Sequence, residues 1–128
     1  GDDDPEHLSL PHSYQRNCVD YTGTHDNNTF RGWFEEEATA KERSGLMRYL
    51  GRKLPYDEAA RELIRCAFMS VADMVIIPLQ DHLALDSGAR MNNPARIHGN
   101  WRWRCTASQM DALPIDAIRE MTVTYGRV

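Results

Sequence analysis

The residues best suited to chemistry lie between Tyr21 and Thr29, where a histidine and an aspartate stand side by side as His25 and Asp26. A neutral imidazole and a carboxylate can both bind sugar hydroxyls, and a carboxylate can also stabilise positive charge that develops during a reaction. The alternative is that Asp26 or Asn27 merely caps the helix that follows. From these residues alone, the catalytic and the capping interpretations both stay open.

A second candidate segment runs over residues 99–104, where Trp101 and Trp103 alternate with Arg102 and Arg104. Such side chains can stack on sugar rings or on nucleic-acid bases, or they can form the buried and the solvated side of an extended segment. Taken by itself, the pattern favours tryptophans packed in the core and arginines in solvent.

The cysteines and histidines do not have the spacing of a metal site. Cys18, Cys66 and Cys105 are far apart, and the sequence contains no CxxC, HxH or HExxH arrangement. We therefore expect no metal ion and no other cofactor. Reduced thiols in a cytoplasmic protein are the preferred interpretation of the three cysteines.

Two short apolar runs predict the strands that position these segments. Residues 18–22 are rich in β-branched and aromatic side chains and end at Gly23, directly before His25 and Asp26. Residues 74–77 show no polar alternation and end at Pro78, which is typical of a strand buried on both faces of a parallel sheet. Polar residues at the carboxyl end of such strands often perform the chemistry of α/β proteins.

Apolar residues recur at helical spacing in four further segments. The expected helices cover residues 29–37, 39–50, 55–71 and 114–125, with a short helical turn within 79–85 and loops over 2–16 and 86–100. Strands that alternate with helices predict a parallel sheet. Two strands pair too little for a self-contained α/β domain, so we expect the chain to form part of a larger sheet or barrel.

Composition excludes several classes of function. The chain has 128 residues and a net charge of −4, so no overall positive field attracts nucleic acid or an anionic membrane. This argues against a nucleic-acid site built from Arg96, Arg102 and Arg104. The longest apolar run is far shorter than the roughly 20 residues of a membrane helix, and the start shows no signal peptide, so we expect a cytoplasmic location.

Five blocks, taken in order, resemble the bacterial and plant 4-alpha-glucanotransferases, also called amylomaltases or disproportionating enzymes. The blocks are residues 21–27 (Tyr-Thr-Gly-Thr-His-Asp-Asn), 32–33 (Gly-Trp), 76–81 (Ile-Ile-Pro-Leu-Gln-Asp), 89–92 (Ala-Arg-Met-Asn) with Pro94, and 99–104 (Gly-Asn-Trp-Arg-Trp-Arg). Their order and approximate spacing agree over essentially the whole chain. The chain resembles the last quarter of these enzymes, and residues 125–127 look like the family's C-terminus.

The resemblance implies an α/β fold, namely the C-terminal part of a (β/α)8 barrel of the alpha-amylase clan, incomplete in this chain. Residues 1–128 would form the last two strand/helix units of the catalytic barrel, with 18–22 as a late strand, 74–77 as the last strand and no second domain. Family members transfer part of an alpha-1,4-glucan to another glucan or to glucose with retention of configuration. Retention requires a nucleophilic carboxylate and a carboxylic acid about 5 Å apart. The resemblance places both upstream of residue 1, so we expect the chain alone to be inactive.

Three site residues carry over by resemblance. Asp26 matches the carboxylate that stabilises the transition state, His25 matches a histidine that binds the same sugar, and Asn92 resembles a donor-subsite contact. Asn28 stands where the family usually has Asp, and Ala95 where it usually has Gly. The first difference could alter a contact beside the His-Asp pair, and the second could stiffen the loop that carries Asn92.

The expected partners follow from these interpretations. They are a maltooligosaccharide or longer alpha-1,4-glucan, the remainder of the barrel, and further copies of the chain that associate through exposed sheet edges. We expect neither nucleic acid nor a membrane as a partner. The alternative function is that of a glucan-binding module without catalysis, or of an enzyme remnant.

Overall fold

The computed structural model, which describes residues 18–127, contains a two-stranded parallel sheet. Strands β1 (Val19–Tyr21) and β2 (Met74–Ile76) pair with Val19 opposite Met74. Parallel neighbours need a long crossover, and here a run of helices supplies it. Both strands lie where the sequence predicts them. The loop expected over residues 2–16 lies outside the described residues.

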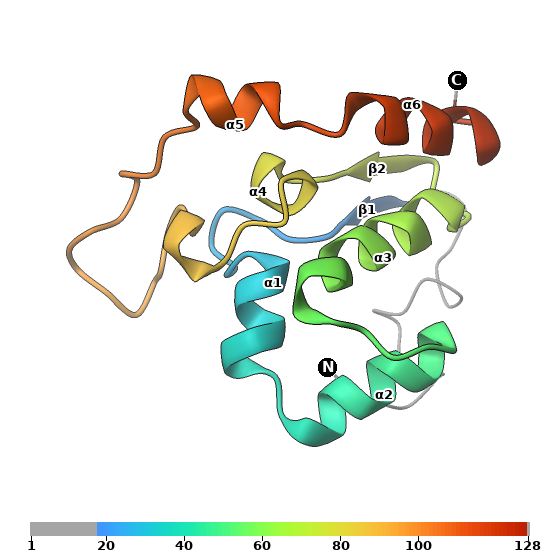
Figure 1. Ribbon diagram of the computed structural model, residues 1–128. Coiled ribbons are helices and arrows are strands. Elements are labelled where there is room, and N and C mark those ends of the chain that lie inside the picture. Colours follow the sequence, from blue (N-terminus) through green and yellow to red (C-terminus); the bar gives the residue numbers. More distant parts are fainter. Residues whose placement is uncertain (1–17, 128) are drawn as a thin grey trace.

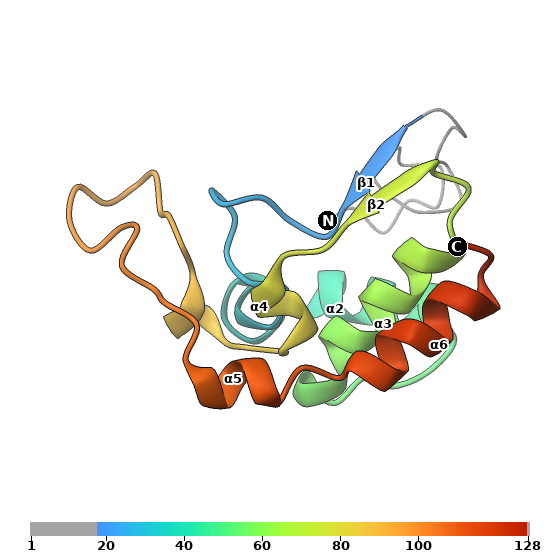
Figure 2. The same ribbon diagram turned by 90° about the horizontal axis from the view of Figure 1, so that it is seen from above.

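Helices form most of the remaining chain. They are α1 (Phe30–Gly32), the π-helix η2 (Trp33–Glu37), α2 (Ala40–Leu50), α3 (Tyr56–Met69), α4 (Leu79–His82), the 3-10 helix η3 (Ser87–Ala89), α5 (Ala107–Asp111) and α6 (Ile115–Thr124). Figure 2 shows α3 and α6 side by side. The segment between η3 and α5 extends away from the other elements in Figures 1 and 2.

The helix ends follow local capping rules. Thr39 accepts a hydrogen bond from the Glu42 amide and the Glu42 side chain bonds back, which forms a capping box at the start of α2. Gly51 ends α2 with a φ of 74°, a left-handed conformation that glycine adopts without strain. The same capping box, built by Thr106 and Gln109, starts α5. Periodicity does not predict α5, because its five residues have no apolar period.

The core lies where the crossover folds back on itself. Phe34 is completely buried against Leu54 and Ala59, and the ring of Tyr56 meets Phe34 edge-on. The expected single helix over residues 29–37 is divided into α1 and a π-helical turn, so that Phe34 still points into this core. This packing fixes the position of α1, and with it one end of the loop that precedes α1.

The end of the described chain caps α3. The Arg127 guanidinium donates hydrogen bonds to the carbonyl oxygens of Phe68 at 2.8 Å, Ser70 at 2.9 Å and Ala72 at 3.0 Å. Carbonyls at a helix C-terminus lack partners within the helix, so a cation there satisfies them. This contact holds α6 beside α3, although α6 itself buries none of its residues.

One face of the sheet is uncovered. Met74 and Ile76 are 55% and 42% exposed, and Val19 and Tyr21 beside them are also exposed. The expectation that residues 74–77 are buried on both faces is therefore wrong for this structure. The physical reason is that no element of the described chain packs on that face, and each strand has only one neighbour.

The cysteines are separate thiols. Cys18, Cys66 and Cys105 form no disulfide with one another. Burial raises the pKa of the Cys66 thiol, because a buried thiolate loses its hydration. The thiol of Cys66 therefore stays protonated at neutral pH.

Candidate functional site

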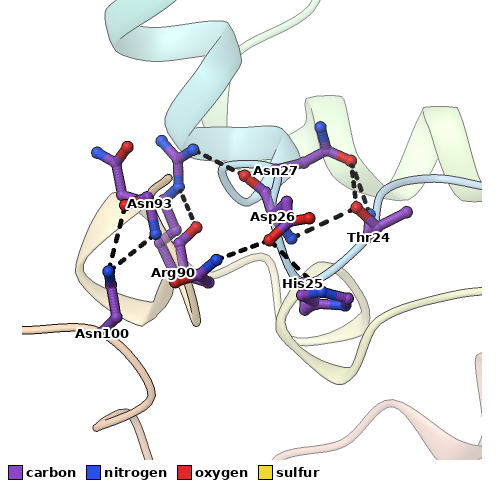
Figure 3. A network of polar contacts seen from close by, with 8 residues as sticks. Thr24, His25, Asp26, Asn27, Arg90, Asn93 and Asn100 are labelled. Atoms are coloured by element: carbon purple, nitrogen blue, oxygen red, sulfur yellow. Dashed lines mark hydrogen bonds and ion pairs between the residues drawn. The ribbon is translucent and has the colours of Figure 1, made fainter. Parts of the chain in front are cut away.

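A tight turn presents His25 and Asp26 at the carboxyl end of β1. The Asn27 side-chain oxygen accepts hydrogen bonds from the Thr24 amide at 2.8 Å and from the Thr24 hydroxyl at 3.0 Å. In return, the Asn27 amide donates to the Thr24 carbonyl at 3.1 Å. Asn side chains stabilise turns in this way. Figure 3 shows His25 and Asp26 on the turn that these two residues close.

A second loop is closed by Asn100. Its Oδ1 accepts a hydrogen bond from the Asn93 amide at 2.9 Å, and its Nδ2 donates to the carbonyls of Asn93 and Arg96. The Trp101 amide donates to the Met91 carbonyl at 2.7 Å. These bonds hold the two ends of the loop over residues 91–101 together, and Asn92 lies at one of these ends.

The two loops meet at the three residues that the resemblance selects. Nδ2 of Asn92 donates to Oδ1 of Asp26 at 2.7 Å, and the Asn92 amide donates to the His25 carbonyl at 3.1 Å. Nε2 of His25 lies 3.4 Å from the same Asp26 oxygen. The structure thus brings together side chains that are 66 residues apart in sequence.

Neither Asp26 nor Asn27 caps the following helix. The cap of α1 is Thr29, whose hydroxyl accepts a hydrogen bond from the Gly32 amide at 3.0 Å. The capping interpretation of Asp26 and Asn27 is therefore wrong. Asp26 instead makes its side-chain contacts with His25 and Asn92.

The His25 and Asp26 side chains are open to solvent, with exposed fractions of 59% and 50%. No donor from the described part of the chain contacts Oδ2 of Asp26. Beside the pair lies a cavity of about 490 Å3, lined by His25, Trp101, Gln80 and other residues around the ends of both strands. His25 lines this cavity, whereas Asp26 and Asn92 are not among its lining residues.

Trp101 is not a core residue. It is 58% exposed, and its ring centroid lies 5.2 Å from that of His25. Its φ of 61° lies in the left-handed region, which is unusual for a bulky residue. The expectation that Trp101 packs in the core is therefore wrong, whereas Trp103 is half-buried.

Asp81 ties down the loop that carries the site, and sequence reasoning assigned it no role. It is 3% exposed, its Oδ2 accepts a hydrogen bond from the Thr22 hydroxyl at 2.7 Å, and its Oδ1 accepts one from the Phe30 amide at 2.9 Å. Thr22 and Phe30 stand at the two ends of the loop. The only sequence signal was membership in the block 76–81.

Arg90 is a second missed residue. Its Nε donates to the Asn92 carbonyl at 2.9 Å, and its Nη2 donates to the Asp26 carbonyl at 2.8 Å. Its Nη1 lies 3.6 Å from Oε1 of Glu37. A single guanidinium therefore contacts the backbone of two of the three predicted site residues.

The two departures from the family pattern lie outside the His-Asp pair. Nδ2 of Asn28 donates to Oε1 of Glu37 at 3.3 Å, and among the described residues its buried Oδ1 has no hydrogen-bond partner. The Ala95 amide donates to the Asn93 side chain at 3.0 Å, and Ala95 is exposed. Neither side chain contacts His25 or Asp26 through a hydrogen bond.

Metal ligands do not gather at the site. Within residues 18–127, no group of three or more histidine, cysteine, aspartate or glutamate side chains could hold a metal ion. The described site presents hydrogen-bonding groups, the Asp26 carboxylate and the aromatic surface of Trp101.

The chain is similar to glucan-transferring proteins along most of its length. Residues 1–110 match a family model described as 4-alpha-glucanotransferase. The chloroplastic or amyloplastic 4-alpha-glucanotransferase of Solanum tuberosum is 44% identical over 128 residues, and that of Streptococcus pneumoniae is 40% identical over 123 residues. The solved amylomaltase of Streptococcus agalactiae in complex with acarbose superimposes with a TM-score of 0.88 at 30% identity.

The chain spans roughly a quarter of these proteins. The matches cover 98%, 96% and 98% of this chain, but only 22%, 24% and 25% of the potato, pneumococcal and S. agalactiae proteins. No helix among the described residues is both long and apolar enough to cross a membrane. Because the potato protein carries an organelle in its name, a cytoplasmic location stays a prediction.

Proposed function

The chain belongs to the 4-alpha-glucanotransferase family, and on that premise we propose that it supplies the sugar-binding and transition-state-stabilising part of an alpha-1,4-glucan transfer site. The observation that carries this proposal is the Asp26 carboxylate. Its Oδ1 is fixed by Asn92 and lies beside His25, while no donor of the described chain contacts Oδ2. A carboxylate held in this way can accept hydrogen bonds from two sugar hydroxyls without first reorganising.

The chemistry follows from the charge of the transition state. Glycosyl transfer passes through an oxocarbenium-like state in which positive charge develops on the sugar ring. Asp26 stabilises that charge and accepts hydroxyl hydrogen bonds that strengthen as the ring flattens. His25 binds a hydroxyl of the same sugar, and Asn92 keeps the Asp26 carboxylate in place. The substrate is then a neutral maltooligosaccharide or longer glucan.

We assign neither the nucleophile nor the general acid to this chain. In this proposal, β1 and β2 are late strands of a (β/α)8 barrel, and the remaining strands supply both carboxylates. The open sheet face at Met74 and Ile76 supports this view, because a barrel would cover it. The 98% coverage of this chain by an amylomaltase at a TM-score of 0.88 supports it as well.

A second function, glucan binding without catalysis, is favoured by one observation. Trp101 presents an exposed indole beside His25 and a cavity, as an aromatic platform for a sugar ring would. Calorimetry of the purified chain with maltooligosaccharides separates the two functions. Saturable binding by a monomeric chain supports the binding module, and no binding supports an incomplete site.

The decisive experiment restores the rest of the enzyme. We define the chimaera as the Streptococcus pneumoniae 4-alpha-glucanotransferase in which this chain replaces the matched 123-residue segment. We expect the chimaera to disproportionate maltotriose, and Asp26→Asn to lower kcat by about a hundredfold, in line with the loss of a transition-state contact. Asp111→Asn, an exposed site on α5, is the matched control and should leave the rate unchanged.

Two results contradict the proposal. One is a folded chimaera in which Asp26→Asn transfers glucan as fast as the parent. The other is disproportionation of maltotriose by the purified chain alone, since the chain would then contain its own nucleophile and acid.

A further inference from the structure

We propose that Arg90 is a positioning residue that sets the orientation of Asp26 by joining the two loops of the site. This proposal rests on the function proposed above, because it gives Asp26 a role in the reaction. It concerns a residue that lines the cavity yet acts through other residues rather than on the sugar.

The contacts of the guanidinium carry the proposal. Nε donates to the Asn92 carbonyl at 2.9 Å and Nη2 donates to the Asp26 carbonyl at 2.8 Å, so one rigid plane bridges the turn and the second loop. The same two residues meet again at 2.7 Å, from Nδ2 of Asn92 to Oδ1 of Asp26. Arg90 thus fixes the backbone on both sides of the hydrogen bond that aims the carboxylate.

Glu37 holds the third nitrogen of this guanidinium. Its Oε1 lies 3.6 Å from Nη1, and the same oxygen accepts a hydrogen bond from Nδ2 of Asn28 at 3.3 Å. All three nitrogens of Arg90 therefore face a protein oxygen, and the side chain is only 20% exposed. Asn28, one of the departures from the family pattern, donates to Glu37 here, which an aspartate in its ionised form could not do.

A lysine at position 90 cannot make the same set of contacts. A guanidinium is a planar fork whose donors point to separate acceptors in fixed directions, whereas an ammonium is a point charge on a flexible stem. Arg90→Lys keeps the charge near Glu37 but loses at least one of the two backbone contacts. The matched control is Arg96→Lys, the same substitution at an exposed side chain of the second loop.

The first experiment measures, in the full chain, whether the two loops of the site stay in contact. The Asn92 amide, which donates to the His25 carbonyl at 3.1 Å, reports whether the two loops stay together. We expect Arg90→Lys to speed hydrogen exchange at this amide at least tenfold, and Arg96→Lys to leave it unchanged. Unchanged exchange in Arg90→Lys overturns the proposal irrespective of any activity.

The second experiment is a double-mutant cycle in the chimaera. A misplaced catalytic group costs up to about a hundredfold in rate, so we expect Arg90→Lys to lower kcat by about tenfold to a hundredfold, with KM within about threefold. If Arg90 acts through Asp26, the same substitution costs less than about threefold in the Asp26→Asn background. A residue that only supports the fold would give equal losses in both backgrounds, and that result overturns the proposal.

The two experiments separate the two proposals. If Asp26→Asn leaves the rate unchanged, the proposed function fails and the role of Arg90 in the reaction fails with it, even where the exchange result holds. If Asp26→Asn lowers kcat but Arg90→Lys does so equally with and without it, only the positioning role fails.

Discussion

At the residue scale, Asp81 shows how a buried carboxylate supports an exposed site. It accepts hydrogen bonds from Thr22 and Phe30, which stand at the two ends of the loop that carries His25 and Asp26. Its removal leaves two donors without an acceptor, and each such loss costs about 1 to 3 kcal/mol. We therefore expect Asp81→Ala to lower the free energy of unfolding by about 3 kcal/mol in urea denaturation.

The control for this prediction is Asp111→Ala, because Asp111 is exposed at the end of α5. It should change the free energy of unfolding by less than about 0.5 kcal/mol. Equal unfolding midpoints for Asp81→Ala and the parent would show that the loop does not depend on Asp81.

His82 gives the chain a pH dependence of known sign. Burial lowers the pKa of its imidazole, and the neighbouring Asp81 carboxylate opposes this only in part. The folded chain then binds fewer protons than the unfolded chain, so stability falls as the pH drops below the ordinary histidine pKa of about 6.5. We expect the thermal midpoint of unfolding to decrease as the pH is lowered from 7.5 to 5.5. His82→Gln should make this decrease smaller.

The matched control for His82 is the exposed His98. His98→Gln should keep the pH dependence of the parent. If His82→Gln and the parent lose the same number of degrees between the two pH values, another group causes the change.

The sequence predicted the site residues themselves better than the residues that hold them in place. His25, Asp26 and Asn92 could be named because their blocks resemble a family, and the structure brings them together, while their roles stay predictions. Arg90 and Asp81 could not be found from periodicity, because their function depends on contacts with residues 51 to 64 positions away. Long-range contacts of this kind leave no local pattern.

At the element scale, Gly32 shows a helix whose position depends on the absence of a side chain. A Cβ at this residue would lie 2.6 Å from Oδ1 of Asn28 and 2.8 Å from the Ser87 amide nitrogen. Alanine normally stabilises a helix relative to glycine by about 1 kcal/mol. The Ser87 atom in this contact belongs to the backbone, which cannot move aside as a flexible side chain can. We therefore expect Gly32→Ala to destabilise the chain by about 1 to 3 kcal/mol.

The matched test of Gly32 uses Ser44→Ala, an exposed position within α2 where propensity acts alone. Urea denaturation should show a small gain for Ser44→Ala and a loss for Gly32→Ala. A gain for both would mean that α1 and η3 can move apart without cost.

The elements were predicted where capping and periodicity agree. Helices α2, α3 and α6 lie within two residues of their predicted bounds, and both strands lie where predicted. The split of the expected 29–37 helix and the short α5 were missed, because a π-helical turn and a five-residue helix have no apolar period of their own. The parallel pairing followed from the order of elements, and the structure confirms it.

At the scale of the whole molecule, the exposed sheet determines how the chain behaves in isolation. Within residues 18–127, Val19, Tyr21, Met74 and Ile76 form one uncovered apolar face, and each strand has one edge that no other strand of this part pairs with. Exposed apolar strands with free edges pair with other chains. We expect the sedimentation coefficient of the purified chain to rise with concentration. The double variant Met74→Lys with Val19→Lys should suppress this rise, because charges on a strand oppose edge pairing.

The matched control is Ile97→Lys. It removes an apolar side chain that is 92% exposed but lies in the loop away from the sheet, so this variant should associate like the parent. A parent chain that stays monomeric at every concentration, or an Ile97→Lys variant that loses association as fully as the sheet variant, would show that the uncovered face does not drive assembly.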